Sequence, residues 1–196
     1  HGLEITRIKS SSELKVINNV ISSSDIVLAV SRFTRDEITN KLKDIDTSHV
    51  KFLPNGVDTN RFYQTEVEAD FYNKYKIPQN SDLILTLARI IKRKAHDDVL
   101  RALPDVLSQF PKAHYIIAGP HRKEDSYFSS LNKLVAELSL EKHVTFIDFL
   151  PDKDLKKIYS ISKVYVMPSR NLHETGDSEG FGITFLEANA CGCPVI

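Results

Sequence analysis

The sequence predicts an α/β fold built on a parallel, doubly wound sheet. From residue 82 onward, short apolar segments alternate with longer segments whose apolar residues recur at helical spacing. The short segments are apolar throughout, as expected for parallel strands that are buried on both faces. Charged residues and glycines follow several of these segments directly, at the strand ends where such sheets bind ligands.

The composition is that of a globular protein with a sizeable core. Of 196 residues, 41% are hydrophobic and 27% are charged. Lysine plus arginine equals aspartate plus glutamate, 26 of each, so the net charge gives no argument for a nucleic acid partner. Cys191 and Cys193 are the only cysteines, and we expect them to be reduced core residues. The scattered histidines show no metal-ligand spacing.

The first 62 residues are predicted to form two strands, two helices and a turn. In order, we expect a helix within 10–24, a strand at 26–30, a helix starting near Thr34, a strand at 50–53, and the turn Pro54-Asn55-Gly56-Val57-Asp58 closed by Phe62. Thr34 and Glu37 are predicted to form a capping box for the second helix.

The remaining residues are predicted to alternate between helices and strands. We expect helices at 67–75, 99–110, 131–138, 152–159 and 182–191, and strands at 83–88, 115–118, 144–147, 164–167 and 193–196. The last of these strands ends the sequence in an apolar run, and the first residue is not methionine. We therefore expect a piece of a longer protein, cut at both ends.

The segment 178–196 carries the strongest chemical signal. Ile183, Leu186, Ala190 and Cys191 form one apolar stripe along the expected helix, and Glu187 falls inside it. We expect this carboxylate to be largely buried and to need hydrogen-bond donors. The helix begins after a glycine-containing turn, so its free N–H groups would favour an anion such as a diphosphate.

Two readings of this segment remain open on residue types alone. Glu179 and Glu187 flank the helix start, an arrangement that suits a ligand with a phosphate middle and hydroxyl groups at both ends, such as a nucleotide sugar. The structural alternative is a loop acid together with a core glutamate that is bonded to backbone.

The same segment resembles a family signature. Glu179 and Glu187, with Gly180-Phe181-Gly182 between them and Glu-Ala-x-Ala-x-Gly-x-Pro-Val-Ile following, are similar to the E-x7-E motif of retaining glycosyltransferases of the GT-B fold, family 4. The resemblance implies a truncated, Rossmann-like nucleotide-sugar-binding domain at 66–196. It further implies an interdomain hinge at 54–65 and the tail of the acceptor domain at 1–53.

The resemblance also assigns roles to residues. Arg89 and Lys94 match a phosphate-binding R-x4-K pair, although Ala88 and Ala95 stand where the family often has glycines. Glu187 would accept hydrogen bonds from the ribose, and Glu179 would lie against the donor sugar as the catalytic candidate. The other implied site residues are His1, facing the donor sugar, Gly119, near the donor, and Gly180, Phe181, Gly182 and Ile183, whose backbone reaches the sugar or diphosphate.

Two of these positions have structural alternatives. Gly119 could equally be a plain strand-ending turn. Asp148, in the segment 146–151 that corresponds to the family's base-contacting loop, could accept a hydrogen bond from a base or cap the helix at 152–159, and we favour the cap.

By resemblance, the intact enzyme would transfer a hexose from a nucleotide diphosphate sugar to a hydroxyl acceptor, such as a sugar or a lipid-linked sugar. It would retain anomeric configuration without a metal or other cofactor, and this piece alone would be inactive. We expect a cytoplasmic protein, with peripheral membrane association of the full-length chain left open. The alternatives are a nucleotide-sugar-binding module without turnover and a GT-B nucleotide-sugar epimerase.

Overall fold

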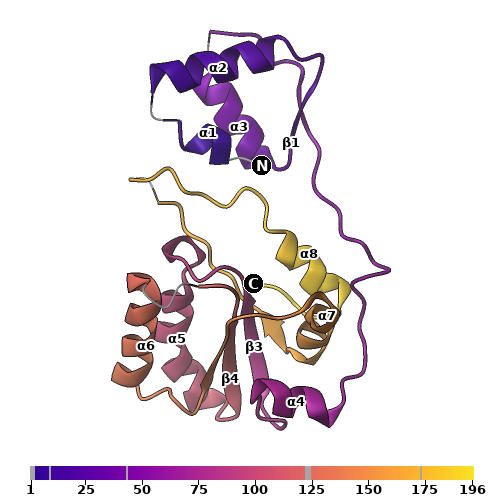
Figure 1. The fold of residues 1–196 in the computed structure, drawn as a ribbon, viewed down its shortest axis with the longest axis vertical. Helices are drawn as coiled ribbons and strands as arrows, with labels where there is room; N and C mark the ends of the chain where they lie inside the picture. Colours follow the sequence, from indigo (N-terminus) through magenta and orange to yellow (C-terminus); the bar gives the residue numbers. More distant parts are fainter. Residues whose placement is uncertain (1–2, 9, 43, 122–124, 173) are drawn as a thin grey trace. The chain divides into compact units, whose positions relative to one another are not determined.

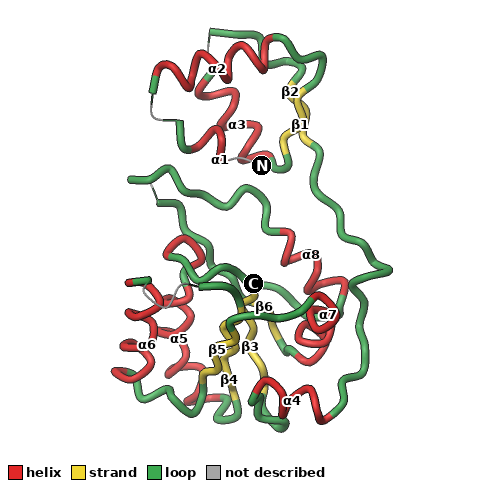
Figure 2. Tube along the Cα trace, viewed as in Figure 1, coloured by secondary structure: helices red, strands yellow, loops and turns green. Residues whose placement is uncertain are grey.

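The computed structural model describes residues 3–8, 10–42, 44–121, 125–172 and 174–196. The chain divides into two compact units. The first combines His1–Gly56 with Ser169–Ile183, and the second combines Val57–Pro168 with Thr184–Ile196. Figures 1 and 2 show the elements of each unit.

The first unit is a small parallel β-pair covered by helices. Its elements are α1 (Leu3–Thr6), α2 (Ser11–Ser22), β1 (Val27–Ala29), α3 (Arg32–Lys41) and β2 (Val50–Phe52). β1 and β2 run parallel, with Val27 opposite Val50. The buried apolar side chains of this unit form one cluster: Ile5, Ile21, Ala29, Ile38, Leu42 and Val50.

Helix α3 begins one turn earlier than the sequence predicted. Ser31 is its N-cap, and the Ser31 hydroxyl accepts a hydrogen bond from the backbone N–H of Thr34 at 3.0 Å. The expected capping box of Thr34 and Glu37 is therefore wrong. Ser31 takes the role because it follows β1 directly in an extended conformation, with Thr34 three positions on and buried.

The second unit is the doubly wound sheet. Its elements are α4 (Ala69–Tyr75), β3 (Asp82–Leu87), η1 (Lys92–Lys94), α5 (His96–Gln109), β4 (Ala113–Ala118), α6 (Ser126–Glu137), β5 (Val144–Ile147), α7 (Asp152–Ile161), β6 (Val164–Tyr165) and α8 (Ile183–Ala190), which starts at the boundary of the units. The strands are parallel in the order β5-β4-β3-β6. The expected final strand reduces to one parallel bridge between Tyr165 and Val195.

Successive residues of β4 supply two cores, one on each face of the sheet. Tyr115 and Ile117 pack in the cluster that α5 and α6 complete, whereas Ile116 and Ala118 pack in the cluster that includes α7 and α8. Figure 1 shows these two helix pairs on opposite sides of the strands. All six residues of β4 are buried, which is why the strand is apolar almost throughout. The predicted doubly wound parallel sheet is confirmed.

The two cysteines lie in the core, as predicted. Cys191 and Cys193 are 0% and 1% exposed and are free thiols. Burial raises the pKa of each thiol to about 11, so both are protonated near neutral pH.

Candidate functional site

The carboxyl end of β3 lies where the strand order reverses. β4 and β5 extend the sheet on one side of β3, and β6 extends it on the other. Doubly wound sheets bind their ligands at such switch points. Arg89 and η1 follow β3 here, and Met167 follows β6. Residues that follow two neighbouring strands are therefore brought to one edge of the sheet.

Lys94 is a buried cation of this edge, as is its neighbour Arg93. Lys94 is 8% exposed, and its ammonium lies 3.3 Å from the sulfur of Met167. Arg89, by contrast, is exposed. η1 ends at Ala95, which takes a left-handed conformation with φ 55° and is fully buried. The Ala95 methyl is thus packed in the fold.

The hydroxyl of Tyr165 links this edge to the first turn of α8. It lies 3.1 Å from the Leu87 carbonyl oxygen, 2.7 Å from the Thr184 hydroxyl and 3.5 Å from the sulfur of Met167. Met167 in turn contacts the Lys94 ammonium. A buried cation and the first turn of a helix therefore share neighbours, and both favour an anion.

Glu187 lies one turn further along α8. Its carboxylate accepts a hydrogen bond from the Tyr159 hydroxyl at 2.8 Å. Tyr159 is fully buried, and burial together with the Glu187 charge raises the pKa of the hydroxyl well above its usual value. The hydroxyl therefore stays protonated and keeps donating to the carboxylate.

The face of α8 that packs on the core differs from the predicted stripe. Ile183 is 45% exposed, whereas Ala188 and Cys191 are fully buried. Glu187 is intermediate in burial, between the fully buried Ala188 and the exposed Asn189. Phe185, Ala188 and Cys191, spaced by three, pack in the core of the second unit, and Ala190 packs beside them.

Gly119 has a clear structural requirement. Its φ is 147°, and a Cβ at this position would lie 2.0 Å from the carbonyl oxygen of Ala88. Its N–H also donates to the Ile147 carbonyl at 2.8 Å. This geometry favours the strand-ending reading of Gly119, and contact with a donor stays a prediction.

The remaining predicted residues lie in the first unit. The Glu179 carboxylate accepts a hydrogen bond from the Ser169 hydroxyl at 3.4 Å. Gly182 has φ 80°, a conformation that favours glycine directly before α8. Gly180, Phe181 and Ile183 are neighbours of these two in the segment Ser169–Ile183. His1 lies outside the described residues.

Asp148 does not cap α7, so the favoured reading of this residue is wrong. The N-cap position is Pro151, without a side-chain hydrogen bond. The Asp148 side chain is largely exposed, and its carboxylate lies 3.4 Å from the ring nitrogen Nδ1 of His121. Asp148 is three residues before the N-cap and turns toward the loop after β4 instead.

Sequence reasoning missed Tyr159, Tyr165 and Met167. Tyr159 lies in the expected helix at 152–159, and Tyr165 and Met167 lie in the expected strand at 164–167, without a predicted role in the site. The available signal was that a buried tyrosine needs a partner for its hydroxyl. Each tyrosine hydroxyl has a partner at the candidate site, Glu187 for Tyr159 and Thr184 for Tyr165.

Comparison with known proteins identifies the family. Residues 67–196 match the model of the family described as glycosyl transferases group 1. The chain belongs to this family. Among the residues that the structure describes, no helix is long and apolar enough to cross a membrane.

Several curated relatives are similar to this glycosyltransferase chain. A GDP-mannose-dependent alpha-(1-6)-phosphatidylinositol monomannoside mannosyltransferase of Mycolicibacterium smegmatis is 29% identical over all of this chain and 50% of its own. A mannosylfructose-phosphate synthase of Agrobacterium fabrum is 25% identical over 90% of this chain and 38% of its own. The chain thus spans half or less of the length of these relatives.

Solved structures confirm the GT-B fold. A glycosyltransferase from Rickettsia africae matches 95% of this chain and 48% of its own, with a TM-score of 0.77 and 24% identity. HepE of Anabaena, solved in complex with UDP and glucose, matches 95% of this chain and 48% of its own, with a TM-score of 0.74 and 22% identity.

Proposed function

We propose that the whole protein is a retaining glycosyltransferase that transfers a hexose from a nucleotide diphosphate sugar to a hydroxyl acceptor. One observation carries this proposal. Lys94, the first turn of α8 and Glu187 are grouped near the carboxyl end of β3, where the strand order of the parallel sheet reverses. A cation and helix N–H groups suit a diphosphate, and a half-buried carboxylate suits ribose hydroxyls.

In this proposal, Lys94 and the α8 N-terminus stabilise the charge that builds on the departing diphosphate. Arg89, exposed beside them, closes on the phosphate when the donor binds. Because these groups supply positive charge themselves, no metal or other cofactor is needed for that role. Glu179 lies against the donor sugar, together with His1 and the backbone of Gly180 to Ile183.

The proposed chemistry is a same-face displacement. The bond from the anomeric carbon to the diphosphate breaks, and the acceptor oxygen attacks from the side that the leaving group vacates. The departing phosphate oxygen accepts the acceptor proton, so the products are the glycoside and a protonated nucleoside diphosphate. Retention follows because both events occur on one face of the sugar.

The relatives' names suggest which substrates to test first. Mannosyltransferases named as GDP-mannose-dependent match the whole chain, so GDP-mannose is the proposed donor. Their named acceptors are phosphatidylinositol mannosides. A lipid-linked acceptor would require the protein to work at a membrane surface, and we propose peripheral association with the membrane on its cytoplasmic side.

The test is product analysis with the whole protein. GDP-mannose or UDP-glucose is supplied with a phosphatidylinositol mannoside, and the product's anomeric configuration is read by NMR. An α-linked hexoside from an α-linked donor supports the proposal. Epimerised donor formed without acceptor supports the epimerase instead, and binding without any product supports a binding module.

A further inference from the structure

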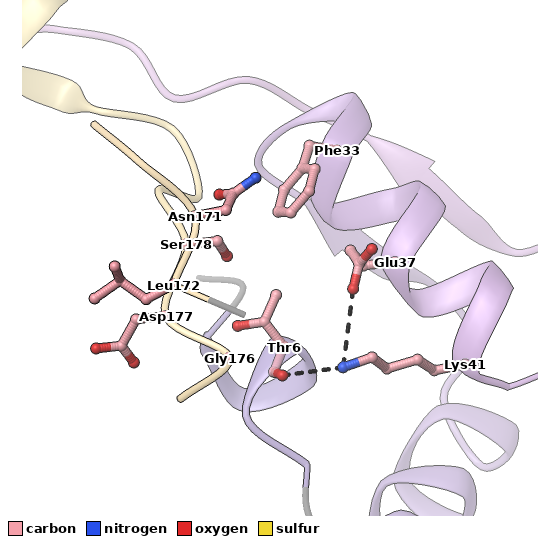
Figure 3. Close-up of a pocket in the computed structure, with 9 residues that line it drawn as sticks. All are labelled: Thr6, Phe33, Glu37, Lys41, Asn171, Leu172, Gly176, Asp177 and Ser178. Carbon is pink, nitrogen blue, oxygen red and sulfur yellow. Dashed lines mark hydrogen bonds and ion pairs between the residues drawn. The ribbon is translucent and has the colours of Figure 1, made fainter. Parts of the chain in front are cut away.

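The first unit contains a cavity of about 250 Å³ between its helices and the segment Ser169–Ile183 (Figure 3). At about 30 Å³ for each water molecule, that is room for about eight waters, the scale of one small ring-shaped ligand. The residues that line it are Thr6, Phe33, Glu37, Lys41, Asn171, Leu172, Gly176, Asp177 and Ser178.

One wall is a stripe of α3. Phe33, Glu37 and Lys41 are spaced by four and so share a helix face. The Lys41 ammonium donates to the carbonyl oxygens of Ile5 at 2.8 Å and Thr6 at 3.0 Å, and it lies 3.8 Å from the Glu37 carboxylate. Its positive charge is therefore already engaged by protein groups.

The facing wall is held in place by α1 and the residue after it. The Arg7 guanidinium is paired with the Asp177 carboxylate. Gly176 packs so closely that a Cβ there would lie 2.4 Å from the Thr6 carbonyl oxygen. Leu172 and Asp177 form an antiparallel bridge that closes the loop. The loop that forms this wall is therefore held in place by contacts within the first unit.

Several polar groups of the cavity are left with hydrogen-bonding capacity. Within the described part of the chain, the Glu37 carboxylate, the Asn171 amide and the Ser178 hydroxyl make no side-chain hydrogen bond. Ser178 is nevertheless only 6% exposed. Figure 3 shows the ring of Phe33 beside Asn171 at the same end of the cavity. Together these groups offer acceptors, donors and an apolar face.

This combination fits a neutral ring bearing several hydroxyl groups. Hydroxyls can donate to Glu37 and exchange hydrogen bonds with Asn171 and Ser178, while ring C–H groups cover Phe33. An anionic group fits poorly, because Lys41 is engaged by two carbonyls and Glu37, and Arg7 is paired with Asp177.

We propose that this cavity binds the sugar or cyclitol ring of the acceptor, a neutral polyhydroxylated ring. The inference rests on the proposed function, in which Glu179 lies against the donor sugar. Ser178 is the residue before Glu179, so the cavity adjoins the place where a transferred hexose would be. The donor sugar has the same hydroxyl chemistry, and the experiment must separate the two sources.

The test uses the whole protein with three substitutions, Glu37→Gln, Asn171→Ala and Ser178→Ala. Each is expected to raise the acceptor KM about tenfold, because a hydrogen bond to the bound ring is lost. The donor KM and the slow hydrolysis of donor without acceptor are expected to stay unchanged. Glu137→Gln is the matched control, since Glu137 forms an exposed i,i+4 pair with Lys133 at 3.7 Å in α6.

An increase in donor KM with an unchanged acceptor KM would assign the cavity to the donor sugar and overturn the proposal. Unchanged constants in all three variants would also overturn it. If the wild-type protein transfers no hexose, the proposed function fails, and the cavity is tested directly. Saturation-transfer NMR with methyl α-mannoside and with myo-inositol should then show binding that Glu37→Gln removes, and no such binding refutes the cavity assignment.

Discussion

Glu187 is partly buried, and within the described ranges its carboxylate accepts one hydrogen bond, from Tyr159, so it has capacity left for a ligand. If it receives ribose hydroxyls, Glu187→Gln should weaken nucleotide binding about ten- to hundredfold. That corresponds to about 1.5–3 kcal/mol for a charge-assisted hydrogen bond. The melting temperature should stay close to that of the wild type. Calorimetric titration and thermal melts run side by side separate these effects, and normal binding with early melting would remove Glu187 from the site.

Tyr159 is expected to act on the nucleotide only through Glu187. Its hydroxyl is buried and donates to the carboxylate at 2.8 Å, which fixes the carboxylate's orientation. Tyr159→Phe should weaken nucleotide binding by a smaller factor, about three- to tenfold. In the double variant with Glu187→Gln the two losses should not add, because both act on one contact. Full additivity, measured by calorimetry in the same buffer, would contradict this linkage.

The proposed role of η1 is to bind the diphosphate through the charge of Lys94. Lys94→Met keeps much of the aliphatic side chain and removes the ammonium that lies against Met167. We expect the affinity for GDP to fall about tenfold or more, while the affinity for guanosine stays nearly unchanged, because only the diphosphate needs the cation. Lys142→Met, at an exposed position before β5, is the control. Equal losses for GDP and guanosine would speak against a phosphate contact.

Strand β4 carries a pH-dependent contribution to stability. His114 is buried, and burial together with neighbouring His143 lowers the pKa of its imidazole to about 4. Between about pH 6.5 and 4 the unfolded chain binds the proton more readily, so stability should fall as pH falls through this window. Urea unfolding at pH 7 and pH 5 should show a loss about 1–2 kcal/mol smaller in His114→Gln than in the wild type. An unchanged loss would refute this contribution.

Whether a helix or strand could be predicted from the sequence depends on how many of its faces are buried. The strands of the second unit could be predicted because burial on both faces makes them continuously apolar, and Ala113–Ala118 is the clearest case. The face of α8 could not, because Ile183 and Leu186 are as apolar as Phe185 and Ala188, which pack on the core. Which stripe is buried depends on how the helix meets the sheet.

The residue types of the site could be predicted from the sequence, but the burial of these residues and the side chains that contact them could not. Arg89 and Lys94 share a motif, yet only the structure separates an exposed arginine from a buried lysine. The hydroxyl contacts of Tyr165 depend on the register that brings β3 beside β6. Such long-range pairing leaves no local pattern in the sequence.

For the whole molecule, each unit displays apolar surface. In the second unit, a cavity of about 730 Å³ lies between α5 and the sheet edge that contains Val164 and Val166. In the first, Leu28 and Phe52 of the β-pair are 54% and 40% exposed. Grooves and strand faces of this kind are places where another segment or a partner packs in many proteins. Together with the greater length of the relatives, this apolar surface supports the proposal that further sequence completes the enzyme.

A polypeptide of residues 1–196 should therefore separate donor binding from transfer. Lys94, Thr184 and Glu187 belong to one unit, so this polypeptide should bind GDP with an affinity within about tenfold of the whole protein's, and Lys94→Met should weaken that binding. It should also bind a dye for apolar surface, such as ANS, more strongly than the whole protein does. Transfer of hexose to acceptor should be undetectable, because donor contacts alone do not orient an attacking hydroxyl. Efficient transfer by residues 1–196 would show that the acceptor contacts are already complete, and that the exposed apolar faces serve another purpose than enclosing substrate.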